Sequence, residues 1–271
     1  MKIMGYEFVP LDELVNMIEI GKYKKVAVIT FDDGFKDLYQ NAYPILKEFN
    51  IPFTLFLITS LIDSKELLWL HKLYISLDKL HLKESESILK SYSDYASNIE
   101  DMSVFIGKVI HSKDKKNIIE LMAAMSIAAK IDEGEEKRLA RDLYLSSKEI
   151  EEMKSNGLTV ETHGHEHWPL TNLNEEETED EIVSSIRFIK EELGGLPKYF
   201  SLPYGTTNKY VIDIVKTSGL KGIATIKSQI ITESSVDLYN LPRICVYDDI
   251  KEIYKIINKY YVKYIYEKLQ Q

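Results

Sequence analysis

Two adjacent aspartates directly follow an apolar, β-branched run, in the segment Thr30-Phe31-Asp32-Asp33-Gly34 after Val26-Ala27-Val28-Ile29. The run is typical of a buried strand, so the pair stands at a strand terminus, where a sheet can present both carboxylates to a ligand. Two neighbouring negative charges repel each other, and a site that keeps both ionised usually has a cation to offset them or divides their roles between ligand and base. The segment therefore predicts a metal site, although Asp-Asp-Gly alone is also a common turn sequence.

Three of the six histidines lie within five residues, in Thr162-His163-Gly164-His165-Glu166-His167-Trp168-Pro169-Leu170. A second short strand-like run, residues 158–161, precedes them. Imidazole and carboxylate together suit zinc or a similar divalent ion, and a catalytic site keeps one coordination position open for water. A histidine cluster alone is also compatible with a solvated loop or an adventitious metal site, but beside the aspartate pair it predicts a three-ligand set of one aspartate and two histidines.

These residues resemble the polysaccharide deacetylases of the NodB homology type, carbohydrate esterase family four. The first motif of that family is T-F-D-D-G, and its second is H-(S/T)-x-x-H, which residues 163–167 match apart from glycine in the Ser/Thr slot. Phe200-Ser201-Leu202-Pro203-Tyr204-Gly205 looks like the third motif, R-P-P-(Y/F)-G, and Leu241-Pro242-Arg243 stands near the fifth, L-x-H. The resemblance covers most of the chain except residues 62–143 and a C-terminal helix.

The resemblance implies a role for each matching residue. Asp33, His163 and His167 would bind the metal. Asp32 would be the base that deprotonates the attacking water, and the backbone N–H of Tyr204 would face the developing oxyanion. The metal would polarise the amide carbonyl and acidify the water, and an N-acetyl group would leave as acetate. Zinc is the expected ion, while cobalt, nickel and manganese can share such a ligand set.

The chain departs from the family pattern at two positions. Ser201 occupies the slot of the third-motif arginine that orients the base, and Arg243 occupies the slot of the fifth-motif histidine that acts as general acid. Arginine stays protonated at physiological pH and cannot donate a proton usefully. We therefore expect Arg243 to supply the missing charge near Asp32 from a different strand. The fourth motif, D-x-x-D-W, has no convincing match, and the proton donor stays open among His165, His71, Tyr204 and a metal-bound water.

Four residues are expected near the substrate. The resemblance places Pro203 and Tyr204 there. Trp168 either packs under the metal loop, which is the favoured interpretation, or stacks on a sugar ring. His165 stands between the two ligand positions and either turns to solvent, bonds a backbone carbonyl or contacts the substrate.

The chain alternates strands and helices. Apolar residues at helical spacing indicate helices over residues 11–20 and 39–49, and strand signals cover residues 26–30 and 53–58, which indicates parallel strands covered by helices. The resemblance narrows the fold class to α/β, a distorted (β/α) barrel of about seven parallel strands, with the site at the C-terminal ends of the strands. The whole chain, residues 1–271, is expected to form a single domain of this type.

Other segments have their own signals. Residues 62–143 carry Lys, Glu, Leu and Ile at helical spacing and predict a helical insertion beside or over the barrel mouth. Within it, Trp69 and His71 are expected to pack in its attachment face, and the alternatives are a place in the substrate cleft or a dimer contact. Helices are expected from Ser146, over residues 174–193 and, at the end of the chain, over 249–269. Residues 241–246 resemble a buried strand.

Composition narrows the functional class. A formal charge of -9 with dispersed Lys and Arg argues against nucleic-acid binding. No segment approaches the ~18 consecutive apolar residues of a membrane span. The first ten residues lack the pattern of a secretory signal, so the chain as written is expected in the cytoplasm, or outside the cell or anchored to a membrane if its N-terminus has been trimmed.

The residues thus favour a metal-dependent deacetylase of an N-acetylated sugar or polysaccharide. Two alternatives remain open: a catalytically weakened carbohydrate-binding relative, and a hydrolase on the same scaffold that acts on a ureide or cyclic imide. The sugar, the ion and the oligomeric state are left open.

Overall fold

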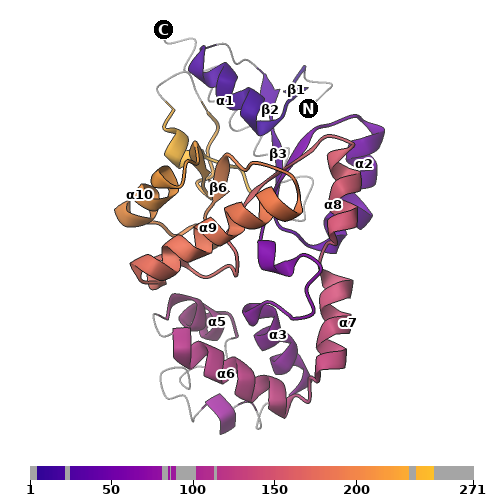
Figure 1. Cartoon of the computed structure of the whole chain (residues 1–271), viewed down its shortest axis with the longest axis vertical. Coiled ribbons are helices and arrows are strands. Elements are labelled where there is room, and N and C mark those ends of the chain that lie inside the picture. Colours follow the sequence, from indigo (N-terminus) through magenta and orange to yellow (C-terminus); the bar gives the residue numbers. More distant parts are fainter. Residues whose placement is uncertain are drawn as a thin grey trace.

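The computed structural model describes residues 5–21, 25–80, 85, 87–89, 102–112, 115–231 and 236–246. Its strands are all parallel and form two sheets, one of two strands and one of five in the order β3-β4-β5-β6-β7. The strands are β1 (Glu7–Phe8), β2 (Val26–Ala27), β3 (Ile29–Asp33), β4 (Phe53–Leu57), β5 (Leu158–Thr162), β6 (Tyr199–Ser201) and β7 (Gly222–Ala224). Within the described residues the larger sheet does not close into a ring, and a single bridge from Leu241 extends its β7 edge, so the expected barrel is a curled half-barrel covered by helices (Figure 1).

The register of the larger sheet aligns the C-terminal ends of strands that are distant in the sequence. Asp33 at the end of β3 pairs with Leu57, which pairs with Thr162 at the end of β5, and Thr162 pairs with Phe200 in β6. Because the strands are parallel, residues that follow β3 and β5 leave the sheet on the same side. The predicted strand over residues 26–30 is divided at Val28 into β2, which pairs with β1, and β3, which pairs with β4.

The helices begin and end where the local sequence favours it. Helix α8 (Ser147–Lys154) starts with a capping box between Ser146 and Glu149, and α9 (Glu175–Glu192) starts with one between Asn174 and Glu177. Both confirm helix starts predicted from the sequence. The other helices around the sheet are α1 (Leu11–Glu19), α2 (Tyr43–Glu48), which follows the π-helical turn η2 (Leu38–Ala42), and α10 (Lys209–Thr217).

Strand β4 is buried on both faces and divides the core. Phe53, Leu55 and Leu57 pack in one cluster with residues of α8 and α9, whereas Phe56 packs in another cluster with α1 and β6 residues such as Tyr199. This alternation follows from the two-residue period of a strand. A central strand without an exposed residue is the pattern expected of a parallel sheet with layers on both sides.

Helices also account for the expected insertion. Between residues 62 and 143, the described residues form α3 (Trp69–Lys79), α5 (Met102–His111), α6 (Lys115–Ala128) and α7 (Glu133–Leu143), and no strand among them. These helices gather at one end of the molecule, away from α1 (Figure 1). Their apolar cluster includes Leu73, Phe105 and Leu121 and continues into Ile58 and Trp168, which attaches the helices to the strand ends. The single-domain assignment of the whole chain stays a prediction.

The predicted strand over residues 241–246 is wrong beyond its first residue. Leu241 alone forms a bridge, with Ala224, and residues 242–246 are not in a strand. Pro242 has no N–H to continue the ladder, and the backbone N–H of Arg243 instead donates to the carbonyl of Lys227 at 3.2 Å. The predicted helix over residues 249–269 lies outside the described residues. No described helix combines the length and the apolar character that a membrane span needs.

Gly34 lies in a tight turn directly after the aspartate pair. Its φ is +107°, and a Cβ atom there would lie 2.7 Å from Cδ1 of Leu57. We expect Gly34→Ala to lower the free energy of unfolding by about 1–3 kcal/mol, because the substitution adds both backbone strain and overlap. Gly107→Ala is the control. Gly107 lies in α5 with nothing within 4 Å of the added Cβ, so this change should raise stability by about 0.5–1 kcal/mol. Urea unfolding of the two variants measures the difference, and equal stabilities would contradict the prediction.

Candidate metal centre and active site

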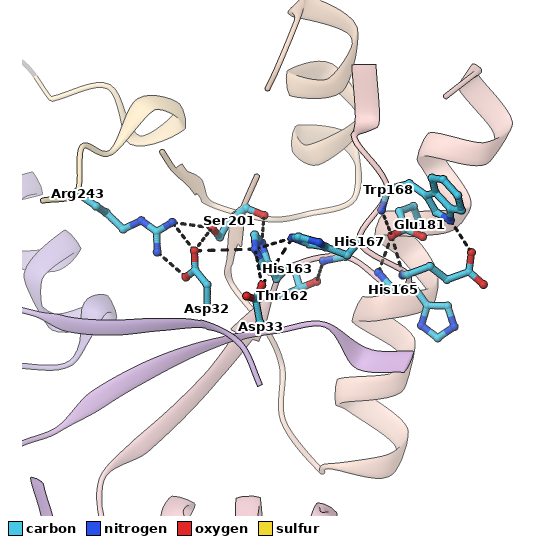
Figure 2. Close-up of polar contacts among 12 residues, drawn as sticks. Asp32, Asp33, Thr162, His163, His165, His167, Trp168, Glu181, Ser201 and Arg243 are labelled. Atoms are coloured by element: carbon cyan, nitrogen blue, oxygen red, sulfur yellow. Dashed lines mark hydrogen bonds and ion pairs between the residues drawn. The ribbon is translucent and has the colours of Figure 1, made fainter. Parts of the chain in front are cut away.

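Three potential metal ligands converge at the C-terminal ends of the strands (Figure 2). Asp33 ends β3, and His163 and His167 belong to the loop that follows β5. The Oδ1 atom of Asp33 lies 3.4 Å from Nε2 of His163 and 3.7 Å from Nε2 of His167. The two Nε2 atoms are 3.2 Å apart. The convergence predicted from the sequence is therefore confirmed.

These three atoms fit a divalent ion. Ligands about 2.0–2.1 Å from a tetrahedral zinc ion are separated by about 3.4 Å from one another, close to the distances between the three atoms. The hydrogen bond of His163 supports the same conclusion. Its Nδ1 lies 2.8 Å from the carbonyl oxygen of Ser201, which can only accept, so Nδ1 carries a proton. In the neutral form of the ring the lone pair is then on Nε2, which faces Asp33 and His167 and is free to bind a metal. The donor set of one carboxylate and two imidazoles suits zinc or a similar ion.

The charges at this centre are unevenly distributed. Burial lowers the pKa of His163, but the hydrogen bond to Asp33 and the nearby carboxylates outweigh it, and the net pKa is raised. Burial, reinforced by the adjacent His163, lowers the pKa of His167 to about 3. Burial raises the pKa of Asp33, yet its hydrogen bond with His163 and the histidine charges bring the net pKa below the ordinary value. An ionised Asp33 beside a neutral His167 is the state that a metal requires.

Three residues at the site have a left-handed backbone. The φ angles are 75° at Asp33, 62° at His167 and 56° at Tyr204. Such angles are uncommon for residues other than glycine and tend to occur where the surrounding structure enforces them, often at functional sites. Sequence reasoning did not find this feature, because the residue types themselves do not indicate it. These conformations turn the backbone at the end of β3, in the loop that follows β5 and after the end of β6.

Asp32, the other member of the pair, makes its hydrogen bonds with Arg243 and Ser201, while its Oδ2 lies 3.9 Å from Nε2 of His163. Nη1 of Arg243 donates to Oδ1 at 2.6 Å, and Nη2 donates to Oδ2 at 2.8 Å. Ser201 completes the arrangement: its hydroxyl accepts from Nη2 at 2.8 Å and donates to Oδ2 of Asp32 at 3.2 Å. Arg243 thus approaches Asp32 as expected. Ser201, which occupies the arginine slot of the third motif, contacts both residues.

Arg243 is itself fixed in place. Its Nε donates to the carbonyl of Thr225 at 3.3 Å, and its guanidinium carbon lies 5.2 Å from the centre of the Phe56 ring. Burial raises the pKa of Asp32, but the hydrogen bonds from Arg243, together with the charges of His163 and Arg243, outweigh it, so the net pKa is lowered. Asp32 therefore stays ionised beside the candidate metal ligands. Its catalytic role and that of Arg243 stay predictions.

The remaining candidate residues occupy different places. His165 turns away from the three candidate ligands (Figure 2), and its Nδ1 lies 2.8 Å from the hydroxyl of Thr59.

Trp168 is 4% exposed and stacks on Trp69, with ring centres 4.6 Å apart, while Nζ of Lys115 lies 5.0 Å from the Trp168 ring. Both faces of the Trp168 ring are therefore covered, which favours packing over contact with a sugar.

Tyr204, Pro203 and His71 do not belong to the three-ligand cluster. The ring of Tyr204 lies 4.6 Å from that of His167, and burial raises the pKa of its phenol. Pro203 precedes it as a buried residue of the 3₁₀ turn η5 (Pro203–Gly205). Burial lowers the pKa of His71, whose Nδ1 lies 2.7 Å from the hydroxyl of Tyr144. Contacts of Pro203 and Tyr204 with substrate stay predictions.

The sequence interpretation missed one residue of this region. Glu181 stands in an acidic run at the start of α9, a pattern typical of a solvated helix start, but its side chain is 5% exposed and its carboxylate accepts hydrogen bonds from the backbone of the histidine loop (Figure 2). Burial raises its pKa to about 7. The available signal was spacing, since Thr178, Glu181 and Ser185 follow one another at three and four residues and form a polar stripe beside the apolar face of α9.

A comparison with protein families shows the family of this chain. The family model described as polysaccharide deacetylase matches residues 20–223, which include both halves of the candidate metal centre. This chain belongs to the polysaccharide deacetylase family. The family resemblance inferred from the motifs is therefore confirmed, and the half-barrel is the fold of its structural neighbours.

Curated relatives within the family are poly-β-1,6-N-acetyl-D-glucosamine N-deacetylases. The protein from Staphylococcus aureus strain MRSA252 is 26% identical over 245 residues, which are 90% of this chain and 62% of that protein. The protein from Staphylococcus epidermidis is 25% identical over 252 residues, which are 92% of this chain and 64% of that protein. The chain thus spans somewhat less than two thirds of the length of these deacetylases.

Solved structures of similar fold include other deacetylases. The match to PplD of Streptococcus pyogenes, solved in complex with acetate, has a TM-score of 0.57 and 20% identity and covers 90% of this chain and 75% of that chain. The match to IcaB of Ammonifex degensii has a TM-score of 0.56 and 18% identity and covers 91% of this chain and 79% of that chain. At these identities the likeness shows the fold.

The geometry of the candidate metal centre predicts which substitutions weaken metal binding. Calorimetric titration of the metal-free chain with Zn²⁺ should show one site per chain. Asp33→Ala, His163→Ala and His167→Ala should each weaken binding by more than the roughly 10- to 100-fold that follows loss of a residue that only supports a ligand. His165→Ala serves as the matched control, because it removes an imidazole of the same loop that turns away from the centre. Equal loss in the control would contradict the assignment of the three ligands.

Proposed function

We propose that this polysaccharide deacetylase is a metal-dependent hydrolase that removes N-acetyl groups from a polymer of N-acetylglucosamine. The observation that carries the proposal is the divided pair of aspartates, with Asp33 among two histidines and Asp32 held by Arg243. Asp33 would thus bind a metal, and Asp32 would accept a proton. The substrate class is supported by the names of the curated relatives, which act on poly-β-1,6-N-acetyl-D-glucosamine.

The residues of the chain divide the work of hydrolysis. A divalent ion held by Asp33, His163 and His167 would polarise the acetamide carbonyl and lower the pKa of water. Asp32 accepts a proton from the water that attacks the carbonyl carbon. Arg243 and Ser201 keep the Asp32 carboxylate in one orientation. The guanidinium donates two hydrogen bonds to the carboxylate and the Ser201 hydroxyl donates a third, while a fourth joins Arg243 to Ser201. The backbone N–H of Tyr204 is proposed to face the carbonyl oxygen as it becomes negative.

Asp32 is also the proposed proton donor to the leaving amine. When the C–N bond breaks, the proton that Asp32 took from water passes to the amine nitrogen, and Asp32 returns to the carboxylate form. The other candidate side chains are less suited: His165 turns away, the raised pKa of Tyr204 makes its phenol a weak acid, and the lowered pKa of His71 keeps its ring neutral. Arg243 favours the return step, because it holds the pKa of Asp32 low.

Acetate release tests the reaction. The full chain supplied with Zn²⁺ should release acetate from poly-β-1,6-N-acetyl-D-glucosamine, and chelation should abolish the release. Asp32→Asn should lower kcat by about 10²- to 10⁴-fold, because the amide cannot accept the proton, while Zn²⁺ binding is kept. Acetate measured enzymatically over a series of N-acetylated oligosaccharides gives the substrate preference.

The same assay separates the rival functions. A chain that binds Zn²⁺ and the polymer but releases no acetate from any saccharide would be a carbohydrate-binding relative and would contradict the proposed hydrolysis. Turnover of a ureide or cyclic imide without turnover of any acetylated sugar would show a different hydrolase. Loss of activity without loss of metal in Asp32→Asn, by contrast, would support the role of Asp32 as base.

Arg243→Ala should move the acid limb of the pH–rate profile to higher pH. In the unaltered chain Arg243 keeps the pKa of Asp32 low, so the base stays ionised as pH falls until that low pKa is reached. Without the guanidinium, burial dominates and raises the pKa, so Asp32 becomes protonated and inactive at a higher pH. The loss of kcat/KM is therefore largest at acidic pH. Arg243→Lys keeps a charge without the two-pronged contact and should give an intermediate profile. An unchanged profile in Arg243→Ala would contradict the proposed role of Arg243.

A further inference from the structure

We propose that Glu181 positions His167 for metal binding by holding the backbone of the loop formed by residues 163–168. The inference rests on the metal centre of the proposed function. Glu181 lies on α9 and does not belong to the three-ligand cluster. Its side chain is 5% exposed and reaches under the loop from the helix (Figure 2). A buried carboxylate so placed requires partners, and the loop provides them.

One oxygen of Glu181 gathers the amides of the loop. Oε1 accepts from the backbone N–H groups of His165 at 3.1 Å, Glu166 at 2.7 Å and Trp168 at 3.4 Å. These residues flank His167 on both sides. Buried backbone N–H groups need an acceptor, and in this loop a single side chain supplies it for three of them. The path of the backbone around His167 is therefore tied to α9.

The opposite side of the loop is held by backbone. The carbonyl oxygens of Gly164 and His165 accept from the N–H groups of Thr59 at 3.2 Å and Ser60 at 3.0 Å, in the 3₁₀ turn η3 (Thr59–Leu61). The loop thus lies between η3, which binds its carbonyls, and Glu181, which binds its amides. A Cβ atom at Gly164 would lie 3.1 Å from Oε1 of Glu181, and its φ is +85°. Glycine at a position where the family motif has Ser or Thr is consistent with this close approach.

His167 depends on the backbone more than His163 does. The ring of His163 is oriented by the hydrogen bond from its Nδ1 to the carbonyl of Ser201. Nδ1 of His167 is buried and has no hydrogen-bond partner among the described residues. No hydrogen bond of Nδ1 within the described part of the chain directs the His167 ring, so its direction depends on packing, such as that against Tyr204, and on its own backbone, which is in the left-handed region at a φ of 62°. Glu181 stabilises this conformation through the amides on either side.

Zinc titration of the metal-free full chain tests the proposal. Glu181→Ala should weaken Zn²⁺ binding by about 10- to 100-fold, the range known for residues that orient metal ligands. Glu181→Gln keeps an oxygen at the same reach and should retain most of the affinity, whereas Glu181→Asp is one methylene shorter and should bind as weakly as the alanine variant. Glu179→Ala is the control, because Glu179 is an exposed acidic residue of the same helix.

A spectroscopic measurement distinguishes positioning from general stability. In the Co²⁺-substituted protein, Glu181→Ala and Glu181→Asp should shift or weaken the visible absorption bands, which depend on ligand geometry, while Glu179→Ala leaves them unchanged. If the alanine variant does not fold, the Asp and Gln pair carries the comparison. Affinity and spectrum unchanged in Glu181→Asp and Glu181→Ala would overturn the role of Glu181 and leave the proposed function intact. Absence of Zn²⁺ binding in the unaltered chain would overturn the metal centre itself, and the positioning role with it.

Discussion

Repulsion between two adjacent carboxylates is the constraint around which this site is organised. Asp32 and Asp33 are consecutive residues of one strand, and both have a lowered pKa despite burial. The structure gives the two carboxylates different main partners, the Arg243 guanidinium for Asp32 and the imidazoles of His163 and His167 for Asp33. The partition also separates the chemistry, because a carboxylate held by arginine is not available as a metal ligand, and one among imidazoles is.

Parallel strands in consecutive order make this partition achievable. The aspartates end β3, the histidine loop leaves β5, Ser201 ends β6, and Arg243 follows the bridge beyond β7. The ends of β3, β5 and β6 and the segment after the bridge therefore contribute the candidate ligands, the proposed base and the residues that hold it. In a parallel sheet all these ends lie on one side, so side chains separated by 211 positions in the sequence can share a hydrogen bond.

Strained backbone conformations and the contacts that enforce them occur together at the C-terminal ends of the strands. Asp33, His167 and Tyr204 have left-handed backbones, which cost free energy unless neighbouring contacts enforce them. Around His167 the enforcement comes from η3 on one side and Glu181 of α9 on the other. The insertion adds a wall on a third side, since Trp69 of α3 covers one face of Trp168, the residue after His167. The site is thus built on strand ends and braced by helices from separate parts of the chain.

The sequence by itself determined the family, the order of strands and helices, the helix starts at Ser146 and Asn174, and the candidate ligands Asp33, His163 and His167. These features are local: a motif, a period or a cap is encoded in residues that are close together in the chain. Tertiary structure decided the rest, because contacts between distant residues leave no local pattern. Only the fold shows that Ser201 joins Arg243 and Asp32 by hydrogen bonds, that Trp168 is covered on both faces, that Pro242 ends the strand begun at Leu241, and that Glu181, one member of an acidic run, is buried beneath the histidine loop.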